Sequence, residues 1–149
     1  MEGVSIVQRI AVICFEEDTA RYDLHYHLLR QLESLFLNNG YHVTKDYPFN
    51  FTYYRGKDRI FREFKGFIDQ VATSPEHTVA IEFDTHGVPK QRSVAKLLQF
   101  NADIHIQILS GGGRYFGGRA EGVIQKVEFE EQKTLWLINI PNKILRERK

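Results

Sequence analysis

A predicted hairpin with one carboxylate in each strand constrains this chain more than any other feature. Residues 66–72 and 78–84 are largely apolar and flank a Ser-Pro turn, a pattern that predicts two antiparallel strands. Asp69 lies in the first run and Glu82 in the second. Antiparallel pairing can bring such residues side by side. Clustered carboxylates repel one another, so we expect a cation between them, and hard oxygen ligands favour Mg²⁺ or Mn²⁺.

The length and composition predict a globular protein of one domain, residues 1–149, with its own core. No apolar run is long enough to cross a bilayer, and the short run 10–15 lacks the cleavage pattern of a signal peptide, so we expect no membrane partner. Cys14 is the only cysteine, which excludes a disulfide framework within the chain. We therefore expect Cys14 to be buried and the protein to be intracellular, in the cytoplasm.

The order of predicted elements indicates an α/β fold. Helical periodicity covers 22–39 and ends at Asn38-Asn39-Gly40, and a second helix is expected over 90–100. Residues 4–15 fit either a strand or a helix, and 55–65 either a loop or an extended arm. Strands are expected over 41–51, 66–72, 78–84, 103–109, 123–130 and 134–140, followed by a frayed tail over 143–149. This order predicts a mixed sheet flanked by helices, with an αβββαβ core over about 22–109 and additional strands over about 123–140.

The distribution of charge says more than the net charge of +1, which does not by itself indicate a nucleic-acid-binding protein. Basic residues outnumber acidic ones over 53–65 and over 86–119, and these two stretches bracket the predicted hairpin. Cations around an acidic centre suit a polyanion whose backbone is drawn onto a metal ion. The alternative is that both stretches are solvated surfaces.

The glycine-rich segment 110–118 invites comparison with a phosphate-binding loop. It lacks the Gly-Lys-Ser/Thr ending of that motif, and no convincing helix follows it. The segment contains Arg114, Tyr115 and Phe116, and Arg119 follows it directly. Arginines can pair with phosphates and aromatic rings can stack on bases. We therefore expect either a nucleic-acid contact or the tip of a hairpin here. The histidines and Cys14 show no zinc-ligand spacing.

The arrangement of acidic and basic residues resembles the PD-(D/E)xK nuclease superfamily, which includes type II restriction enzymes and archaeal Holliday-junction resolvases. The resemblance rests on Ile68-Asp69, on Ile81-Glu82-Phe83-Asp84 and on Lys96 in the helix that follows, and it covers roughly residues 28–109. It implies a restriction-endonuclease-like fold. It also implies a metal-dependent DNA endonuclease that hydrolyses phosphodiester bonds by means of metal-activated water.

The resemblance also implies a role for each residue. Asp69, Glu82 and the carbonyl of Phe83 would bind Mg²⁺ or Mn²⁺, Lys96 would assist the attacking water, and Glu33 on the first helix would support the site. The residues expected to contact DNA are Lys90, Arg92, Arg114 and Arg119. The chain departs from the family pattern at Asp84, where the family usually has lysine, and Lys96 matches the variant that carries the lysine on the following helix. Asp84 itself fits either a third ligand or a cap for the loop before Pro89.

Two other functions remain open from the sequence. The missing lysine at position 84 favours a catalytically inactive nucleic-acid-binding or assembly module with the same fold. A pure protein-interaction domain would show no salt-dependent affinity for nucleic acid. For the nuclease we expect a homodimer, because one small domain leaves little surface for reading a sequence and cutting both strands requires two sites.

Overall fold

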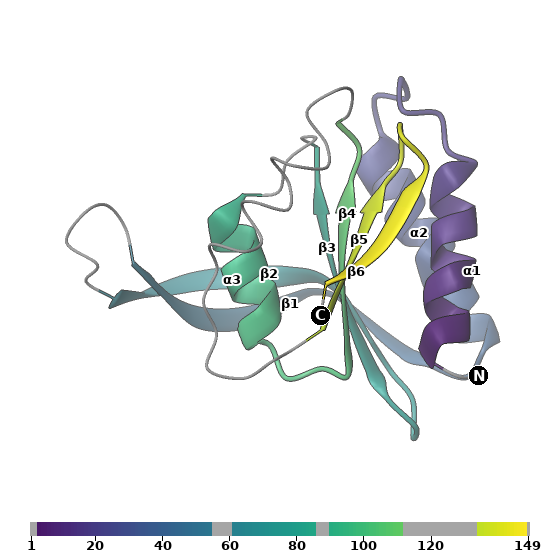
Figure 1. Cartoon of the computed structure of the whole chain (residues 1–149). Coiled ribbons are helices and arrows are strands. Elements are labelled where there is room, and N and C mark those ends of the chain that lie inside the picture. The colour runs from purple at the N-terminus through teal and green to yellow at the C-terminus, as the bar shows by residue number, and fades with distance from the viewer. Residues whose placement is uncertain (1–2, 55–60, 86–89, 112–133, 149) are drawn as a thin grey trace.

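The computed structural model describes residues 3–54, 61–85, 90–111 and 134–148, and over these residues it contains a six-stranded mixed sheet flanked by helices (Figure 1). The elements in chain order are α1 (Gly3–Phe15), α2 (Leu24–Asn38), β1 (His42–Tyr54), β2 (Phe61–Thr73), β3 (Thr78–Asp84), α3 (Gln91–Gln99), β4 (Ile104–Leu109), β5 (Leu135–Asn139) and β6 (Ile144–Arg148). No helix in these ranges has both the length and the apolar character needed to cross a membrane.

The strands lie in the sheet in the same order as in the chain. β1, β2 and β3 form an antiparallel meander, β4 and β5 continue parallel to β3, and β6 returns antiparallel to β5. Parallel neighbours need a crossover, and α3 supplies it between β3 and β4. The stretch from α2 to β4 therefore has the predicted αβββαβ order, and the predicted mixed α/β class is confirmed.

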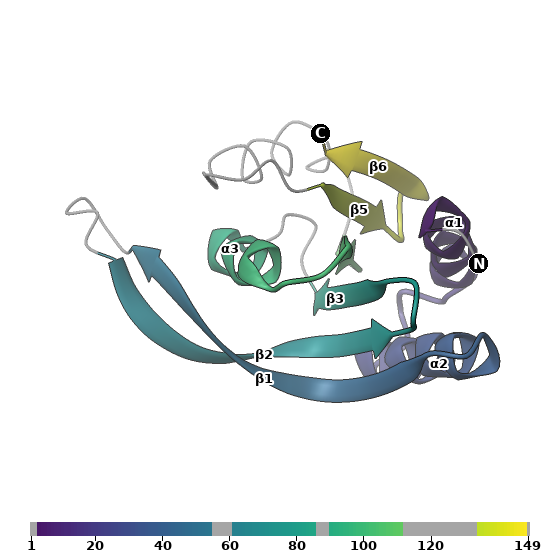
Figure 2. The same ribbon diagram turned by 90° about the horizontal axis from the view of Figure 1, so that it is seen from below.

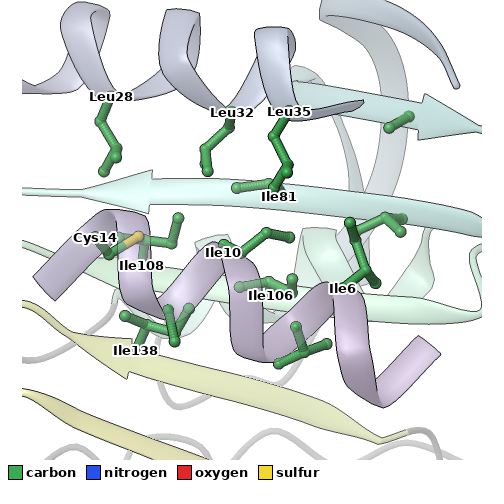
Figure 3. Close-up of a cluster of buried hydrophobic side chains, with 14 of the residues drawn as sticks. Ile6, Ile10, Cys14, Leu28, Leu32, Leu35, Ile81, Ile106, Ile108 and Ile138 are labelled. Carbon is green, nitrogen blue, oxygen red and sulfur yellow. The ribbon is translucent and has the colours of Figure 1, made fainter. Parts of the chain in front are cut away.

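Helices α1 and α2 cover one face of the sheet with an apolar core. Figure 3 shows side chains of both helices directed at residues of β3, β4 and β5; the labelled ones are Ile6, Ile10, Cys14, Leu28, Leu32, Leu35, Ile81, Ile106, Ile108 and Ile138. The buried residues of α1 recur every four positions, which places them on one side of a helix. Residues 4–15, which fitted a strand or a helix from the sequence, thus belong to a helix. Cys14 is buried there as expected.

Helix α3 packs on the opposite face. Its buried residues include Val94, Leu97 and Leu98, as the sequence predicts, and they lie against Val71 of β2 and Leu109 of β4. Side chains of a strand alternate between the two faces of the sheet. The residues next to Val71 and Leu109 in the sequence therefore point to α1 and α2. This alternation decides which polar side chains of the sheet share the α3 side.

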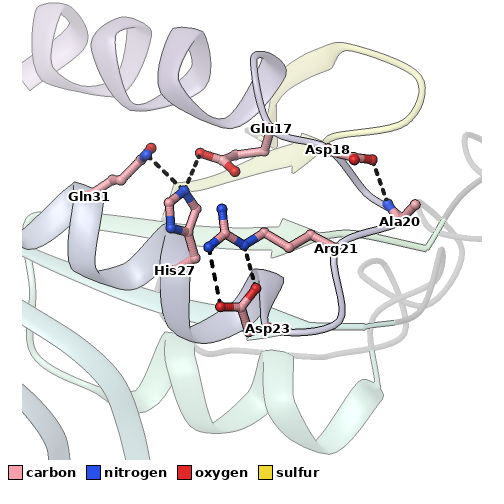
Figure 4. Close-up of polar contacts among 7 residues, drawn as sticks. All are labelled: Glu17, Asp18, Ala20, Arg21, Asp23, His27 and Gln31. Carbon is pink, nitrogen blue, oxygen red and sulfur yellow. Dashed lines mark hydrogen bonds and ion pairs between the residues drawn. The ribbon is translucent and has the colours of Figure 1, made fainter.

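Polar contacts organise the connection between α1 and α2 (Figure 4). Arg21 pairs with Asp23 just before α2 begins, and the Ala20 backbone N–H donates to Asp18 Oδ1 at 2.9 Å. His27 Nε2 lies 3.5 Å from Glu17 Oε1 and 2.9 Å from Gln31 Nε2. These contacts fix the entry of α2, the helix that presents His25 to the sheet.

The predicted hairpin of β2 and β3 is confirmed, although β2 begins earlier than expected. The backbone N–H of Ser74 donates to the carbonyl of His77 at 2.9 Å, which closes the turn. β2 starts at Phe61 and pairs with β1 along its whole length, from Tyr54↔Phe61 to His42↔Thr73. The segment 61–65 is therefore strand, and β1 and β2 form a long two-stranded arm beside α3 (Figure 2).

The prediction of a frayed tail over 143–149 is wrong for β6. Asn139 Oδ1 accepts a hydrogen bond from the Asn142 backbone N–H at 3.0 Å. The turn closed by this bond folds the chain back onto β5. Leu145 packs against the core, which anchors an otherwise charged strand. The predicted strand over 134–140 is confirmed as β5, whereas the one over 123–130 lies outside the described residues.

Candidate metal site

The two carboxylates of the hairpin lie next to each other across β2 and β3. The last paired residues before them are Gln70 and Ile81, so the same register places Asp69 opposite Glu82. Ile81 faces the core under α1 and α2, and Glu82, the next residue, therefore faces α3. The structure thus brings together the pair of acids on which the sequence interpretation depends.

Asp69 is held by contacts to the neighbouring strand and to α2. Its Oδ2 accepts a hydrogen bond from the backbone N–H of Phe83 at 2.8 Å. His25 Nε2 lies 3.8 Å from the same oxygen, and the His25 ring stacks on the ring of Phe83 with centroids 4.5 Å apart. These contacts orient Asp69 where β2 and β3 begin to separate. No sequence motif marks His25 as a neighbour of this acid.

Glu82 is buried and pairs with the lysine of α3. Lys96 Nζ lies 2.8 Å from Glu82 Oε1, and the two side chains are 15% and 5% exposed. Burial raises the pKa of Glu82 to about 8, the negative charge of Asp69 adds to the rise, and Lys96 opposes it. One lysine therefore does not fully offset the charge of the two acids, and the site favours a further cation or a proton.

A basic cavity opens beside this pair, between the arm and α3. It has a volume of about 360 Å³ and is lined by Phe51, Lys65, Gly66, Lys90, Arg92, Ser93 and Lys96. Its charged lining residues are all cations, and Lys96 joins the cavity to Glu82. Lys90 and Arg92, both predicted to contact DNA, therefore line the same cavity as Lys96. Lys65 was missed as an individual residue, although it lies in the basic stretch 53–65.

Aromatic side chains of the arm support the wall of the cavity. The guanidinium of Arg92 lies over the ring of Phe64, 4.9 Å from its centroid, and Phe64 stacks on Phe51 at 5.7 Å. Gly66 allows the close approach of α3, because a Cβ there would lie 3.0 Å from the Phe51 ring and 3.2 Å from Lys96 Cδ. The path of Lys96 to Glu82 thus depends on the absence of a side chain at position 66.

Two other acids that the sequence singled out have different partners. Glu33 pairs with Lys45 of β1, and Glu33 Oε2 lies 2.8 Å from Lys45 Nζ. The cation next to Glu33 is therefore a lysine of β1, whereas Asp69 and Glu82 would share a metal ion. Asp84 is buried, and its Oδ2 accepts from the backbone N–H of Lys90 at 3.3 Å. This bond joins Asp84 to Lys90, the residue just before α3. Arg114 and Arg119 lie outside the described residues.

The acids fit a hard divalent cation held by few protein ligands. Within residues 3–54, 61–85, 90–111 and 134–148, no three His, Cys, Asp or Glu side chains group closely enough to hold a metal ion. Asp69 and Glu82 would therefore bind a cation as a pair, with the remaining positions filled by other oxygens, as Mg²⁺ often allows. The Phe83 backbone, bonded to Asp69, lies at this pair, and the role of its carbonyl stays a prediction.

Comparison of the chain with protein-family models, with curated proteins and with solved structures found no match.

Proposed function

We propose that this protein is a metal-dependent DNA nuclease with a restriction-endonuclease-like fold. The observation that carries the proposal is the contact of Lys96, which lines a basic cavity, with Glu82, the acid that lies opposite Asp69 on the paired strand. The αβββαβ order of the elements from α2 to β4 agrees with the family that the sequence resembles. Asp69 and Glu82 come from paired strands and Lys96 from the next helix, as the lysine-displaced variant of that family requires.

The acids and the lysine divide the chemistry between them. Asp69 and Glu82 would hold Mg²⁺ or Mn²⁺, and such a bound ion supplies a nucleophilic water and stabilises charge on a phosphate. Lys96 contacts Glu82 and also lines the cavity, so its ammonium can donate hydrogen bonds to a phosphate or a water there. His25 and the Phe83 N–H keep Asp69 in place.

The cavity supports a nucleic acid as the substrate. Lys65, Lys90 and Arg92 present positive charge in one place, which suits the phosphate backbone of DNA. Lys65 comes from the arm and the other two from the start of α3, so a strand held by them passes beside Lys96. The expected homodimer stays a prediction, which sedimentation of the intact chain would test.

A catalytically inactive nucleic-acid-binding module is the second candidate, and Asp84 favours it. Asp84 stands where the family usually has lysine, and its hydrogen bond to the Lys90 backbone gives it a structural role. In that case Lys96 would only neutralise Glu82. Such a module would bind DNA in EDTA and leave it uncut in either Mg²⁺ or Mn²⁺.

Cleavage of plasmid and branched DNA tests the proposal. The intact chain is expected to cut in Mg²⁺ or Mn²⁺ and to stop in EDTA. Asp69→Asn and Glu82→Gln are expected to abolish cutting while the fold is retained, because each removes a charged ligand. Glu33→Gln is the matched control, since Glu33 also has a lysine 2.8 Å away but faces Lys45. Cutting by the Asp69 and Glu82 variants at the level of the intact chain would reject the proposal.

A further inference from the structure

Gln107 of β4 is a buried residue whose amide has no hydrogen-bond partner in the part of the chain that the structure describes. Its side chain is fully buried, and both Oε1 and Nε2 are unsatisfied. A buried amide without partners costs free energy, and most such groups in native proteins find a partner or an ordered water. Gln107 therefore points to a missing polar neighbour.

The register of the sheet places this amide in the row of the two acids. β3 and β4 are parallel and Glu82 is paired with Gln107. Gln107 is two residues from Leu109, which packs with α3, so it lies on the same face as Glu82. Asp69, Glu82 and Gln107 thus occupy adjacent positions on β2, β3 and β4, with neighbouring strands about 4.8 Å apart.

We infer that Gln107 is a third polar residue of the cation site and binds water in the hydration shell of the ion. This inference rests on the proposed function, because it requires a divalent ion at Asp69 and Glu82. Mg²⁺ and Mn²⁺ bound by few protein ligands retain several waters, and these waters need acceptors. Gln107 Oε1 accepts from such a water, and the water shell gives Nε2 an acceptor in turn. Gln107 is thus a positioning residue for the ion.

The variant Gln107→Met tests the inference through ion affinity and stability, both measured without DNA. Methionine has a similar length and no amide, so removal of the unsatisfied group should leave the melting temperature of the ion-free protein unchanged or higher. The dissociation constant for Mn²⁺, measured by titration, should rise about 10- to 100-fold, as for other residues that support metal ligands. A glutamine that only supported the fold would not give both an unchanged or higher melting temperature and a higher Mn²⁺ dissociation constant when replaced by methionine.

Gln70→Met is the matched control. Gln70 is also fully buried, on β2, which β3 separates from β4, but its Nε2 donates to the Leu29 carbonyl at 2.9 Å, on the side of α2. This variant should lower the melting temperature and leave the Mn²⁺ dissociation constant within about twofold. Gln107→Glu provides a second variant of nearly the same shape, and its added carboxylate should tighten Mn²⁺ binding and lower the stability of the ion-free protein.

The outcomes separate this inference from the proposed function. Mn²⁺ binding by Gln107→Met at the affinity of the intact chain, or an unchanged affinity in Gln107→Glu, would overturn the role of Gln107 and leave the nuclease proposal standing. Absence of Mn²⁺ binding by the intact chain would overturn both. Weaker binding in Gln107→Met, together with an unchanged affinity in Gln70→Met, would support the inference.

Discussion

Lys96 Nζ lies 2.8 Å from Glu82 Oε1, so helix α3 delivers its lysine to a carboxylate carried by the neighbouring strand. The lysine stands on a different element from the one where the resembling family usually places it, yet it reaches the same acid. Because Lys96 also lines the basic cavity, it links the acids to the place where a phosphate would lie.

The titration of Glu82 should make the ion-free protein less stable as pH rises. Its pKa is about 8 in the folded protein against an ordinary value of 4.5, so between these values the folded state binds more protons than the unfolded one. The free energy of unfolding should therefore fall from about pH 4.5 to pH 8. Denaturant unfolding in EDTA at several pH values, for the intact chain and for Glu82→Gln, measures this difference.

The Glu82→Gln variant should lose that part of the pH dependence, whereas Glu33→Gln should keep it. Ion binding should show the opposite trend from stability, since the ion competes with the proton on Glu82, and Mn²⁺ affinity should rise as pH approaches 8. An identical pH profile for the intact chain and Glu82→Gln would contradict the assignment of a raised pKa to this residue.

Lys96→Met should impair both cleavage and the balance of charge at the site. Loss of the ammonium removes a donor to the phosphate and should lower the cleavage rate on the order of 10²-fold. It also leaves Glu82 buried without its cation, so stability at pH 9 should fall by about 3 kcal/mol. Lys45→Met is the control, because Lys45 is exposed and pairs with Glu33. Rates measured under single-turnover conditions that are equal for both variants would exclude a catalytic role for Lys96.

Gly66→Ala should disturb the approach of Lys96 to Glu82. The new Cβ would lie 3.2 Å from Lys96 Cδ and 3.0 Å from the Phe51 ring, so one of these side chains must move. We expect about a tenfold loss of cleavage rate and about 1 kcal/mol of stability. Phe67→Ala on the same strand, at an exposed position, serves as the comparison. A Gly66→Ala protein with full activity would show that Lys96 reaches Glu82 without needing a glycine at position 66.

Lys90→Gln should weaken DNA binding in a way that depends on salt. If Lys90 contacts a phosphate, its loss should reduce the slope of log affinity against log salt concentration by about 1. Lys143→Gln, in the turn between β5 and β6, should leave this slope unchanged. Binding is measured in EDTA, which separates affinity from cleavage, and equal slopes for the two variants would remove Lys90 from the DNA-binding surface.

Much of the fold was predictable, because local patterns determine it. The apolar runs of β2 and β3, the helical spacing in α2 and the Ser74 turn all act over a few residues. β6 was missed because its stability comes from pairing with β5 and from the packing of Leu145, which are tertiary effects on a charged segment. Residues 61–65 could be a loop or an extended arm from the sequence, and pairing with β1, which is also a tertiary effect, makes them part of the arm.

The candidate site was predictable where strand pairing determines it. Asp69 and Glu82 could be matched from the hairpin, and Lys96 from the family variant that carries the lysine on the following helix. Glu33 lies on the expected helix, α2, but its side chain pairs with Lys45 of β1. The spacing of residues in the sequence does not reveal this pairing. His25 and Gln107 were missed because their positions beside the acids depend on how α2 and β4 pack in three dimensions.

Anomalous scattering from a crystal soaked in Mn²⁺ tests the central claim most directly. The account predicts a manganese peak within bonding distance of carboxylate oxygens of both Asp69 and Glu82, and no peak at this position in a crystal of Asp69→Asn. A peak elsewhere, or carboxylates that share no ion at a Mn²⁺ concentration that supports cleavage, would contradict it.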